Sequence, residues 1–396
     1  MTQYLPYGEF KWVEPSLNGL NDLNDTSEIG RIYEVDISYP QHLHDEHNDL
    51  PFLPYNHKDI PQGSKVQKLM ATLELKEKYI IHYRNLQQAI ANGLIVEKVH
   101  RVLQFKQSPW MVNYINLNTE KRKNATNEFE KDFYKLLNNA VFGKTMESMR
   151  KKIKMVLVSS EQRIRKLINR TTFKYCTNYD NKNLSAVTLE NKIVHFCKPI
   201  YIGFAVLEIS KTLMYDYHYN VMKSHYKEAI NLMYTDTDSL VYYIKTDDFY
   251  NDLQTNPNLL NRMDTSNLPR DHSCFIAERK KIPGLFSDES NGQTIHEFIA
   301  LRAKSYAYII DGQEKIKAKG IRKHVVKKHM TFEHHKKCLF GEPELDLYRE
   351  NISIRSVKHK ISTINTKKLT FNRFDDKRFV MRDQIHTLAH GHYRIQ

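Results

Sequence analysis

The chain has 396 residues, of which 40% are hydrophobic and 27% are charged, and its formal net charge is +14. This composition excludes a disordered or membrane-embedded protein, and the length allows two or three units of ordinary domain size. A basic excess of this size favours a polyanionic partner, most commonly nucleic acid. The four cysteines lie far apart and we find no signal peptide or transmembrane run, so we expect an intracellular protein in a reducing compartment, with no membrane partner.

Residues 1–125 are expected to form strands joined by loops. Residues 32–37 alternate well enough to predict a strand that stops at Pro40, with Asp36 near its end, where a carboxylate can reach a site above a sheet. The histidine-rich run over residues 42–47 makes a zinc site conceivable, but no second pair of ligands stands out, so we expect a polar loop. The other predicted elements are a strand over residues 79–83, a short helix over residues 86–90 capped by Gly93, and strand segments over residues 94–96 and 99–105.

A helix is predicted to begin after Asn127 and to continue without proline to about residue 152. One stripe of this helix is apolar and is predicted to be buried: Phe133, Leu136, Leu137 and Ala140. A second stripe combines a cation, an amide and an aromatic ring, Lys135, Asn139 and Phe142, and Gly143 leaves room beside them. Such a face can bind a nucleotide, with lysine on the triphosphate and the ring on the base or sugar. The alternative is a solvated face with a stray aromatic residue.

Residues 232–244 place two aspartates between two apolar, aromatic-rich runs. This pattern predicts a β-hairpin with Asp236 and Asp238 at its tip, after a helix that includes residues 204–214. Neighbouring carboxylates repel each other and favour a hard divalent cation such as Mg²⁺. The alternative is a solvated acidic turn, because aspartate is common in turns.

The last part of the chain is basic. Residues 298–308 predict a strand that carries Lys304 and Tyr306. Lys319, Gly320 and Arg322 follow in a run suited to phosphate contacts, and a solvated run of charges is the alternative.

Three of these segments resemble the motifs of family B DNA polymerases. Residues 234–239, Tyr-Thr-Asp-Thr-Asp-Ser, resemble motif C. Residues 135–143 resemble motif B, with Phe142 where tyrosine is commoner, and residues 304–306 match the KxY motif. Within this family, the chain resembles the protein-primed branch more than the other branches. The protein-primed branch is found in adenovirus-like viruses, linear plasmids and self-synthesising DNA transposons.

The resemblance implies an α+β fold. Its palm would be an antiparallel sheet with helices beneath, joined to helical fingers and a C-terminal thumb-like region. On this basis residues 1–125 are expected to form a palm portion with an insertion of the protein-primed type. Residues 126–192 would form the fingers, residues 193–310 the palm with motif C, and residues 311–396 a basic thumb-like region.

The resemblance also implies a two-metal mechanism with Mg²⁺ or Mn²⁺ held by aspartates of motifs A and C. Asp238 is expected to be the stronger metal ligand of motif C and Asp236 the weaker. Asp36, in a shortened Asp-Ile-Ser-Tyr-Pro sequence, is the candidate for motif A. The alternative is that Asp36 is a look-alike and that the true motif precedes Met1.

The implied partners are a DNA template-primer, dNTPs and a terminal protein that acts as primer. The residues expected at the dNTP are Lys135, Asn139, Phe142 and Gly143. Those expected at the primer and DNA are Lys304, Tyr306, Lys319, Gly320 and Arg322.

The chain has no room for the N-terminal proofreading exonuclease of the family. We therefore expect a chain truncated at its start, with weak or absent polymerisation on its own. Two alternatives remain open from the sequence: a catalytically inactive, polymerase-derived DNA-binding protein, and an unrelated basic nucleic-acid-binding protein.

Overall fold

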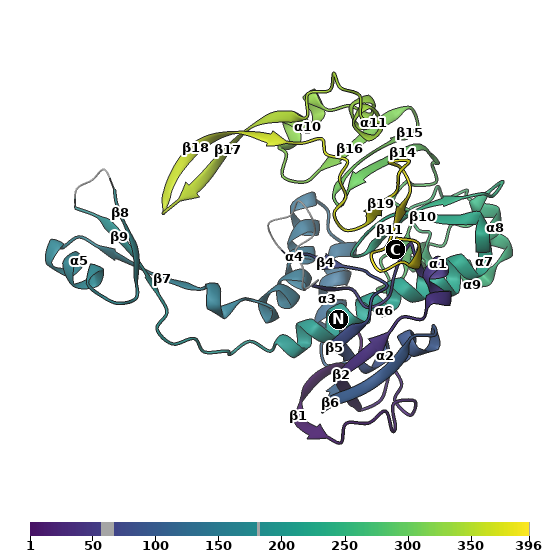
Figure 1. The fold of residues 1–396 in the computed structure, drawn as a ribbon, viewed down its shortest axis with the longest axis horizontal. Helices are drawn as coiled ribbons and strands as arrows, with labels where there is room; N and C mark the ends of the chain where they lie inside the picture. The colour runs from purple at the N-terminus through teal and green to yellow at the C-terminus, as the bar shows by residue number, and fades with distance from the viewer. Residues whose placement is uncertain (57–66, 180–182, 396) are drawn as a thin grey trace.

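A computed structural model describes residues 1–56, 67–179 and 183–395. The fold mixes helices with several antiparallel sheets, which confirms the α+β prediction. A long central helix separates a sheet made by the start of the chain from the sheets made by its second half (Figure 1).

The first part of the chain forms a four-stranded antiparallel sheet in the order β1-β6-β2-β5. Its strands are β1 (Leu5–Val13), β2 (Ile29–Ser38), β5 (Lys76–His82) and β6 (Ile95–Ser108). Helix α2 (Tyr83–Ala91) covers one face, and Gly93 follows it with a φ of +88°. Side chains alternate between the faces of a strand, and the apolar residues Tyr33, Val35 and Ile37 of β2 are buried beneath the helices.

Helices α3 (Val112–Lys123) and α4 (Glu128–Thr145) pack side by side. The predicted cap at Asn127 is confirmed, since its side chain accepts a hydrogen bond from the backbone N–H of Glu130 at 2.9 Å. The predicted buried stripe is wrong, because Phe133 and Leu136 are 44% and 61% exposed. The packed face lies further round the helix, where Asn138 accepts a hydrogen bond from Asn118 of α3 and Val141 packs against the core shared with α6.

A smaller module projects as an arm from the rest of the molecule (Figure 1). It contains β7 (Ile153–Val158), α5 (Glu161–Ile168), β8 (Phe173–Asn178) and β9 (Ser185–Glu190), with the strand order β7-β9-β8.

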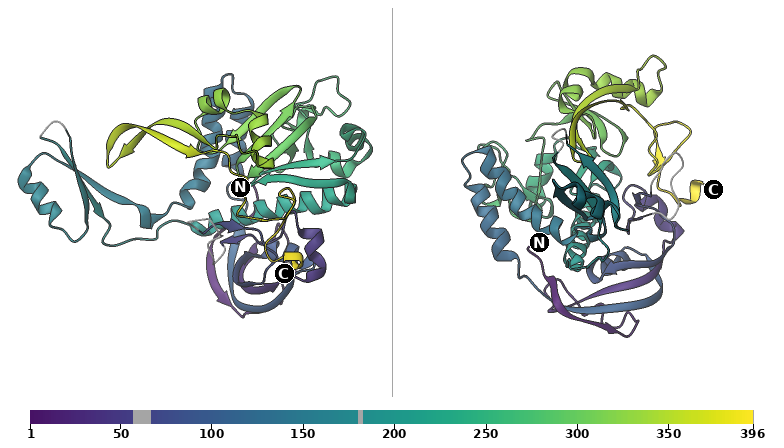
Figure 2. Two further views of the ribbon diagram at one scale, coloured as in Figure 1. Left: turned by 45° about the horizontal axis from the view of Figure 1, so that its top comes forward. Right: turned by 90° about the vertical axis from the view of Figure 1, so that its left-hand side faces the viewer.

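The central helix α6 (Ile200–Asp216) continues directly into a π-helical segment, η3 (Tyr217–Lys223). Tyr215 and Tyr219 belong to the core of the first sheet, whereas Tyr217 and Val221 pack on the other side against the predicted hairpin. That hairpin is confirmed as β10 (Ile230–Asp236) and β11 (Ser239–Ile244). The central helix therefore lies between the first sheet and the hairpin (Figure 2).

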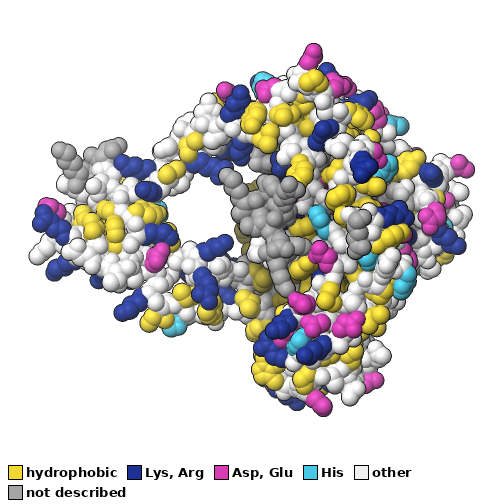
Figure 3. Space-filling model, viewed as in Figure 1, with side chains coloured by type: hydrophobic (Ala, Val, Ile, Leu, Met, Phe, Trp, Pro, Cys, Tyr) yellow, Lys and Arg dark blue, Asp and Glu magenta, His cyan; other side chains and the backbone are white. Residues whose placement is uncertain are grey.

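The C-terminal half adds the sheet β14 (Ile295–Arg302), β15 (Ser305–Ile310) and β16 (Gln313–Ala318), followed by α10 (Lys323–His329) and α11 (Phe332–Phe340). A long hairpin, β17 (Tyr348–Val357) and β18 (Lys360–Leu369), then reaches the arm. At its tip, the carbonyl of Lys358 accepts a hydrogen bond from Thr177 at 2.6 Å, and His359 lies 3.0 Å from the Thr188 hydroxyl. Figure 3 shows the resulting opening between arm and body, with Lys and Arg side chains along its edge.

The last residues return to the start of the chain, where the backbone N–H of Ala389 donates to Asn48 at 2.9 Å.

None of the described helices is long and apolar enough to span a membrane. The remaining short helices and turns are η1 (Gln41–Leu43), α1 (His44–His47), η2 (Met149–Lys151), α7 (Ser224–Tyr226), η4 (Lys227–Ala229), α8 (Phe249–Thr255), α9 (Pro257–Leu260), η5 (Ala277–Arg279) and η6 (Tyr393–Ile395). The remaining short strands are β3 (Tyr55–Asn56), β4 (Leu69–Met70), β12 (Met263–Asp264), β13 (Phe286–Ser287), β19 (Phe379–Val380) and β20 (Thr387–Leu388).

Candidate active site

The tip of the β10–β11 hairpin is a tight turn over Thr237 and Asp238. Asp236 pairs with Ser239 across the turn, and the backbone N–H of Asp238 donates to the carbonyl of Asp236 at 2.7 Å. Thr237 adopts a φ of +61°, a conformation that a β-branched residue rarely takes. Such strain persists only where the surroundings hold it, and it occurs most often at functional sites.

The two carboxylates of the tip have different surroundings. Asp236 lies 3.2 Å from the ammonium group of Lys304 and accepts a hydrogen bond from the Thr237 hydroxyl at 3.2 Å. Asp238 is exposed, and its carboxylate has no hydrogen bond or ion pair to any described residue. Asp238 is therefore the carboxylate that is available to an added cation.

Lys304 reaches the hairpin from a second turn. The prediction of one strand over residues 298–308 is wrong, because the chain reverses at Ala303 and Lys304 between β14 and β15. Lys304 has a φ of +63° without the glycine or asparagine that normally marks such a turn. Its conformation is held from outside, since its backbone N–H donates to the Tyr234 hydroxyl at 2.9 Å.

Aromatic rings extend this contact between the two turns. The ring centroids of Tyr234 and Tyr306 are 4.7 Å apart. Burial raises the pKa of both phenols, and the backbone hydrogen bond from Lys304 partly opposes this for Tyr234. The structure thus brings Asp236 next to Lys304 and Tyr306, which lie far from it in the sequence.

Asp36 lies elsewhere. Its carboxylate accepts a hydrogen bond from the backbone N–H of Lys78 at 2.7 Å and lies 2.8 Å from His100, and these two contacts lower its pKa. Asp36 occupies the face of β2 opposite to Val35 and Ile37, which point toward the central helix. The hairpin packs on the far side of that helix, so the sheet and the helix separate Asp36 from Asp238.

This separation corrects the prediction that Asp36 faces Asp238 across a metal pair. Among residues 1–56, 67–179 and 183–395, no three His, Cys, Asp or Glu side chains lie together as a metal site. The zinc site considered over residues 42–47 is not formed within these limits either. The hairpin alone offers two carboxylates, which fits an ion such as Mg²⁺ that takes one or two carboxylates and completes its shell with water and substrate phosphates.

The second stripe of α4 is open to solvent. Lys135, Asn139 and Gly143 are exposed and Phe142 is half-buried. A Cβ atom added at Gly143 would meet nothing within 4 Å, so this chain itself does not require glycine there. No described hydrogen bond or ion pair joins this stripe to Asp236 or Asp238, and its role at a nucleotide stays a prediction.

The predicted basic run begins beside the Lys304 turn. The backbone N–H of Lys319 donates to the carbonyl of Lys304 at 3.0 Å, and Gly320 has a φ of +86°. The backbone N–H of Arg322 donates to Asn351 of β17 at 3.0 Å, which fixes the run against the long hairpin. Sequence reasoning missed Arg302 and Lys368, which lie at the same place in the fold.

The DNA polymerases of type B, organellar and viral, match residues 1–223 of the 396 residues. The chain therefore belongs to this family, which confirms the resemblance inferred from the motifs and excludes an unrelated basic protein. A comparison with curated proteins gave no match.

The fold is similar to that of Phi29 DNA polymerase. The orthorhombic crystal form of that enzyme has a TM-score of 0.57 at 14% sequence identity, over 93% of this chain and 55% of that chain. Its ternary complex with primer-template DNA and incoming nucleotide substrates has a TM-score of 0.56 at 15% identity, over the same shares. The chain thus spans about half the length of these solved polymerases.

Proposed function

We propose that the chain is the polymerase region of a DNA-directed DNA polymerase, which transfers nucleotides from dNTPs to a primer 3′-hydroxyl or to a hydroxyl of a terminal protein. The observation that carries this proposal is the contact between the β10–β11 turn and the β14–β15 turn. Lys304 engages Asp236 at 3.2 Å, while Asp238 beside it stays exposed and free of described partners.

Asp238, with Asp236 next to it, would hold Mg²⁺ or Mn²⁺. When bound, such an ion lowers the pKa of an attacking hydroxyl and balances the charge of the triphosphate. No group of three His, Cys, Asp or Glu side chains forms a metal site within the described ranges, and the first sheet and the central helix lie between Asp36 and the hairpin, so the proposal assigns Asp36 no part in holding the ion.

The other predicted residues have supporting roles. The exposed ammonium of Lys135 is suited to neutralise triphosphate charge, and Asn139, Phe142 and Gly143 would line the nucleotide site. Lys304, which lies 3.2 Å from Asp236, and Tyr306 would steady the primer end. Lys319, Gly320 and Arg322 would contact DNA phosphates.

Primer extension with Mg²⁺ tests this assignment. We expect Asp238→Asn to reduce extension by about a hundredfold or more, because the substitution removes the free anionic ligand. Asp247→Asn is the matched control, since Asp247 is an exposed aspartate just beyond the same hairpin. Equal extension by both variants would show that the hairpin is not part of the active site.

A catalytically inactive DNA-binding protein is the second candidate. The observation in its favour is that Asp36 lies behind the first sheet and that no described group of three ligands completes a metal site. The same samples separate the two candidates. Primer-template binding without any extension by the unsubstituted chain would favour the inactive protein.

A further inference from the structure

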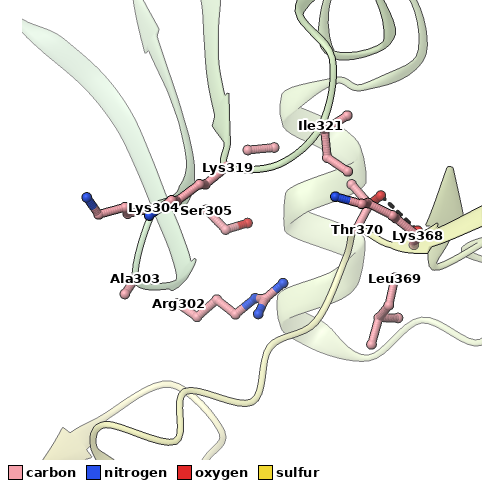
Figure 4. A pocket seen from close by; sticks show the side chains of 10 residues that line it. Arg302, Ala303, Lys304, Ser305, Lys319, Ile321, Lys368, Leu369 and Thr370 are labelled. Atoms are coloured by element: carbon pink, nitrogen blue, oxygen red, sulfur yellow. Dashed lines mark hydrogen bonds between the residues drawn. The ribbon is translucent and has the colours of Figure 1, made fainter. Parts of the chain in front are cut away.

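An open pocket lies where the β14–β15 turn meets the end of β18 (Figure 4). Its volume is about 320 Å³. Four of its ten lining residues are cations and none is acidic; the cations are Arg302, Lys304, Lys319 and Lys368. The pocket therefore suits an anion.

Two polar groups in the pocket have no partner among the described residues. Ser305 is only 5% exposed, yet its hydroxyl makes no hydrogen bond. The Nε atom of Arg302 is likewise buried without a partner. Both side chains point into the space in front of β18 (Figure 4). Buried donors without acceptors are unfavourable, and a bound anion would supply the missing acceptors.

Lys368 adds a third donor whose position is already fixed. Its ammonium donates to the carbonyl of Gly320 at 2.9 Å and still has two further hydrogens to offer. Gly320 keeps this approach open, because a Cβ atom there would lie 3.3 Å from the Lys368 nitrogen. Lys304, by contrast, points away toward Asp236.

We propose that Arg302, Ser305 and Lys368 form a binding site for a phosphate group, and that its ligand is a backbone phosphodiester of the bound primer strand. A guanidinium, a hydroxyl and an ammonium match the oxygens of a phosphate, and the apolar side chains of Ile321 and Leu369 beside them suit a sugar. The pocket adjoins the Lys304 turn at the hairpin, so a strand that ends at the hairpin passes this site. The inference rests on the proposed function for the identity of the strand.

Binding of primer-template DNA, measured by fluorescence anisotropy over a range of salt concentrations, tests the site without requiring catalysis. We expect Arg302→Gln and Lys368→Gln each to weaken DNA binding roughly three- to tenfold. Each should also reduce the slope of log affinity against log salt concentration by about one, because one phosphate contact is lost. Arg382→Gln is the matched control, because Arg382 is exposed and lies outside the pocket. Ser305→Ala is a smaller change that checks the same site if Arg302→Gln misfolds.

A scan of the primer identifies the ligand. Single methylphosphonate linkages remove the charge of one phosphate at a time, and we expect one position to weaken binding to the unsubstituted chain but not to Arg302→Gln. If every position acts equally on both proteins, the pocket assignment is wrong while DNA binding stands. If Arg302→Gln instead loses only the binding of inorganic pyrophosphate, the site takes free phosphates and the strand assignment is overturned. If the unsubstituted chain binds no DNA, the proposed function falls together with the strand assignment.

Discussion

Tyr234 joins the two turns of the candidate active site through a single hydroxyl group. This hydroxyl accepts a hydrogen bond from the backbone N–H of Lys304, a residue whose φ is +63°. We expect Tyr234→Phe to cost about 0.5–1.5 kcal/mol of unfolding free energy, the usual net contribution of one hydrogen bond. Lys304 would lose its support, so primer extension should fall further than stability alone explains. Tyr243→Phe is the control, because Tyr243 is 53% exposed on the same hairpin.

The result is read by urea unfolding and by extension rates at saturating dNTP. Equal rates for Tyr234→Phe and Tyr243→Phe would show that the Lys304 turn does not need the Tyr234 hydroxyl.

At single residues, the sequence predicted chemistry better than position. The acidic tip at Asp236 and Asp238 follows from a local pattern of apolar runs around a turn, and local patterns can be read directly. The Lys304 turn could not be predicted, because it contains no glycine, asparagine or proline and is held by a distant hydroxyl. Asp36 was misplaced although a signal was present. The apolar residues Val35 and Ile37 on either side mark the buried face of the strand, and alternation puts Asp36 on the other.

At the scale of elements, the orientation of α4 decides which of its side chains face a nucleotide. The start of the helix and its cap were predictable from Asn127. Its end at Thr145, rather than near residue 152 as predicted, and its buried face were not. That face is set by α3 and α6, whose positions depend on contacts remote in sequence. Gly203 of α6 allows a close contact between the two helices, because a Cβ atom there would lie 2.4 Å from the side chain of Met146 at the end of α4.

Two glycine substitutions separate the packing of α4 from its binding face. Alanine favours a helix over glycine by about 1 kcal/mol at both positions, so the difference between the variants removes this gain. We expect Gly203→Ala to be less stable than Gly143→Ala by about 1–3 kcal/mol, because only Gly203 is crowded. Gly143→Ala should retain stability but raise the KM for dNTP, since its new methyl group lies on the proposed nucleotide face. Thermal unfolding measures the difference in stability, and dNTP titrations measure the KM. An unchanged KM in Gly143→Ala would show that this face of α4 does not contact the nucleotide.

At the scale of the whole molecule, the layers are joined by buried histidines. His47 packs against Tyr219 of the central helix, and His218 lies 3.0 Å from the Tyr242 hydroxyl of the hairpin. His82 belongs to the first sheet, next to the contact of that sheet with α6. Burial lowers the pKa of His47 and His82 to about 3 and that of His218 to about 4. These side chains are therefore neutral in the folded protein at neutral pH.

Acid should consequently unfold the protein through these contacts. An unfolded histidine has a pKa near 6.5, so between about pH 6.5 and pH 3–4 the unfolded chain binds more protons than the folded chain. Stability contributed by the neutral histidines is complete above pH 6.5 and is lost as the pH falls toward the folded values. For three such groups the expected loss of unfolding free energy between pH 7.5 and 5.5 is up to about 4 kcal/mol.

His82→Phe should remove about a third of this pH dependence, because it removes one of the three histidines. Phenylalanine suits the site, since both ring nitrogens of His82 lack described hydrogen-bond partners and the new ring has no polar atom to satisfy. His195→Gln, at an exposed position, should leave it unchanged. Urea unfolding of the three proteins at both pH values measures the difference, and a dependence that is the same in His82→Phe as in the unsubstituted chain would contradict the assignment.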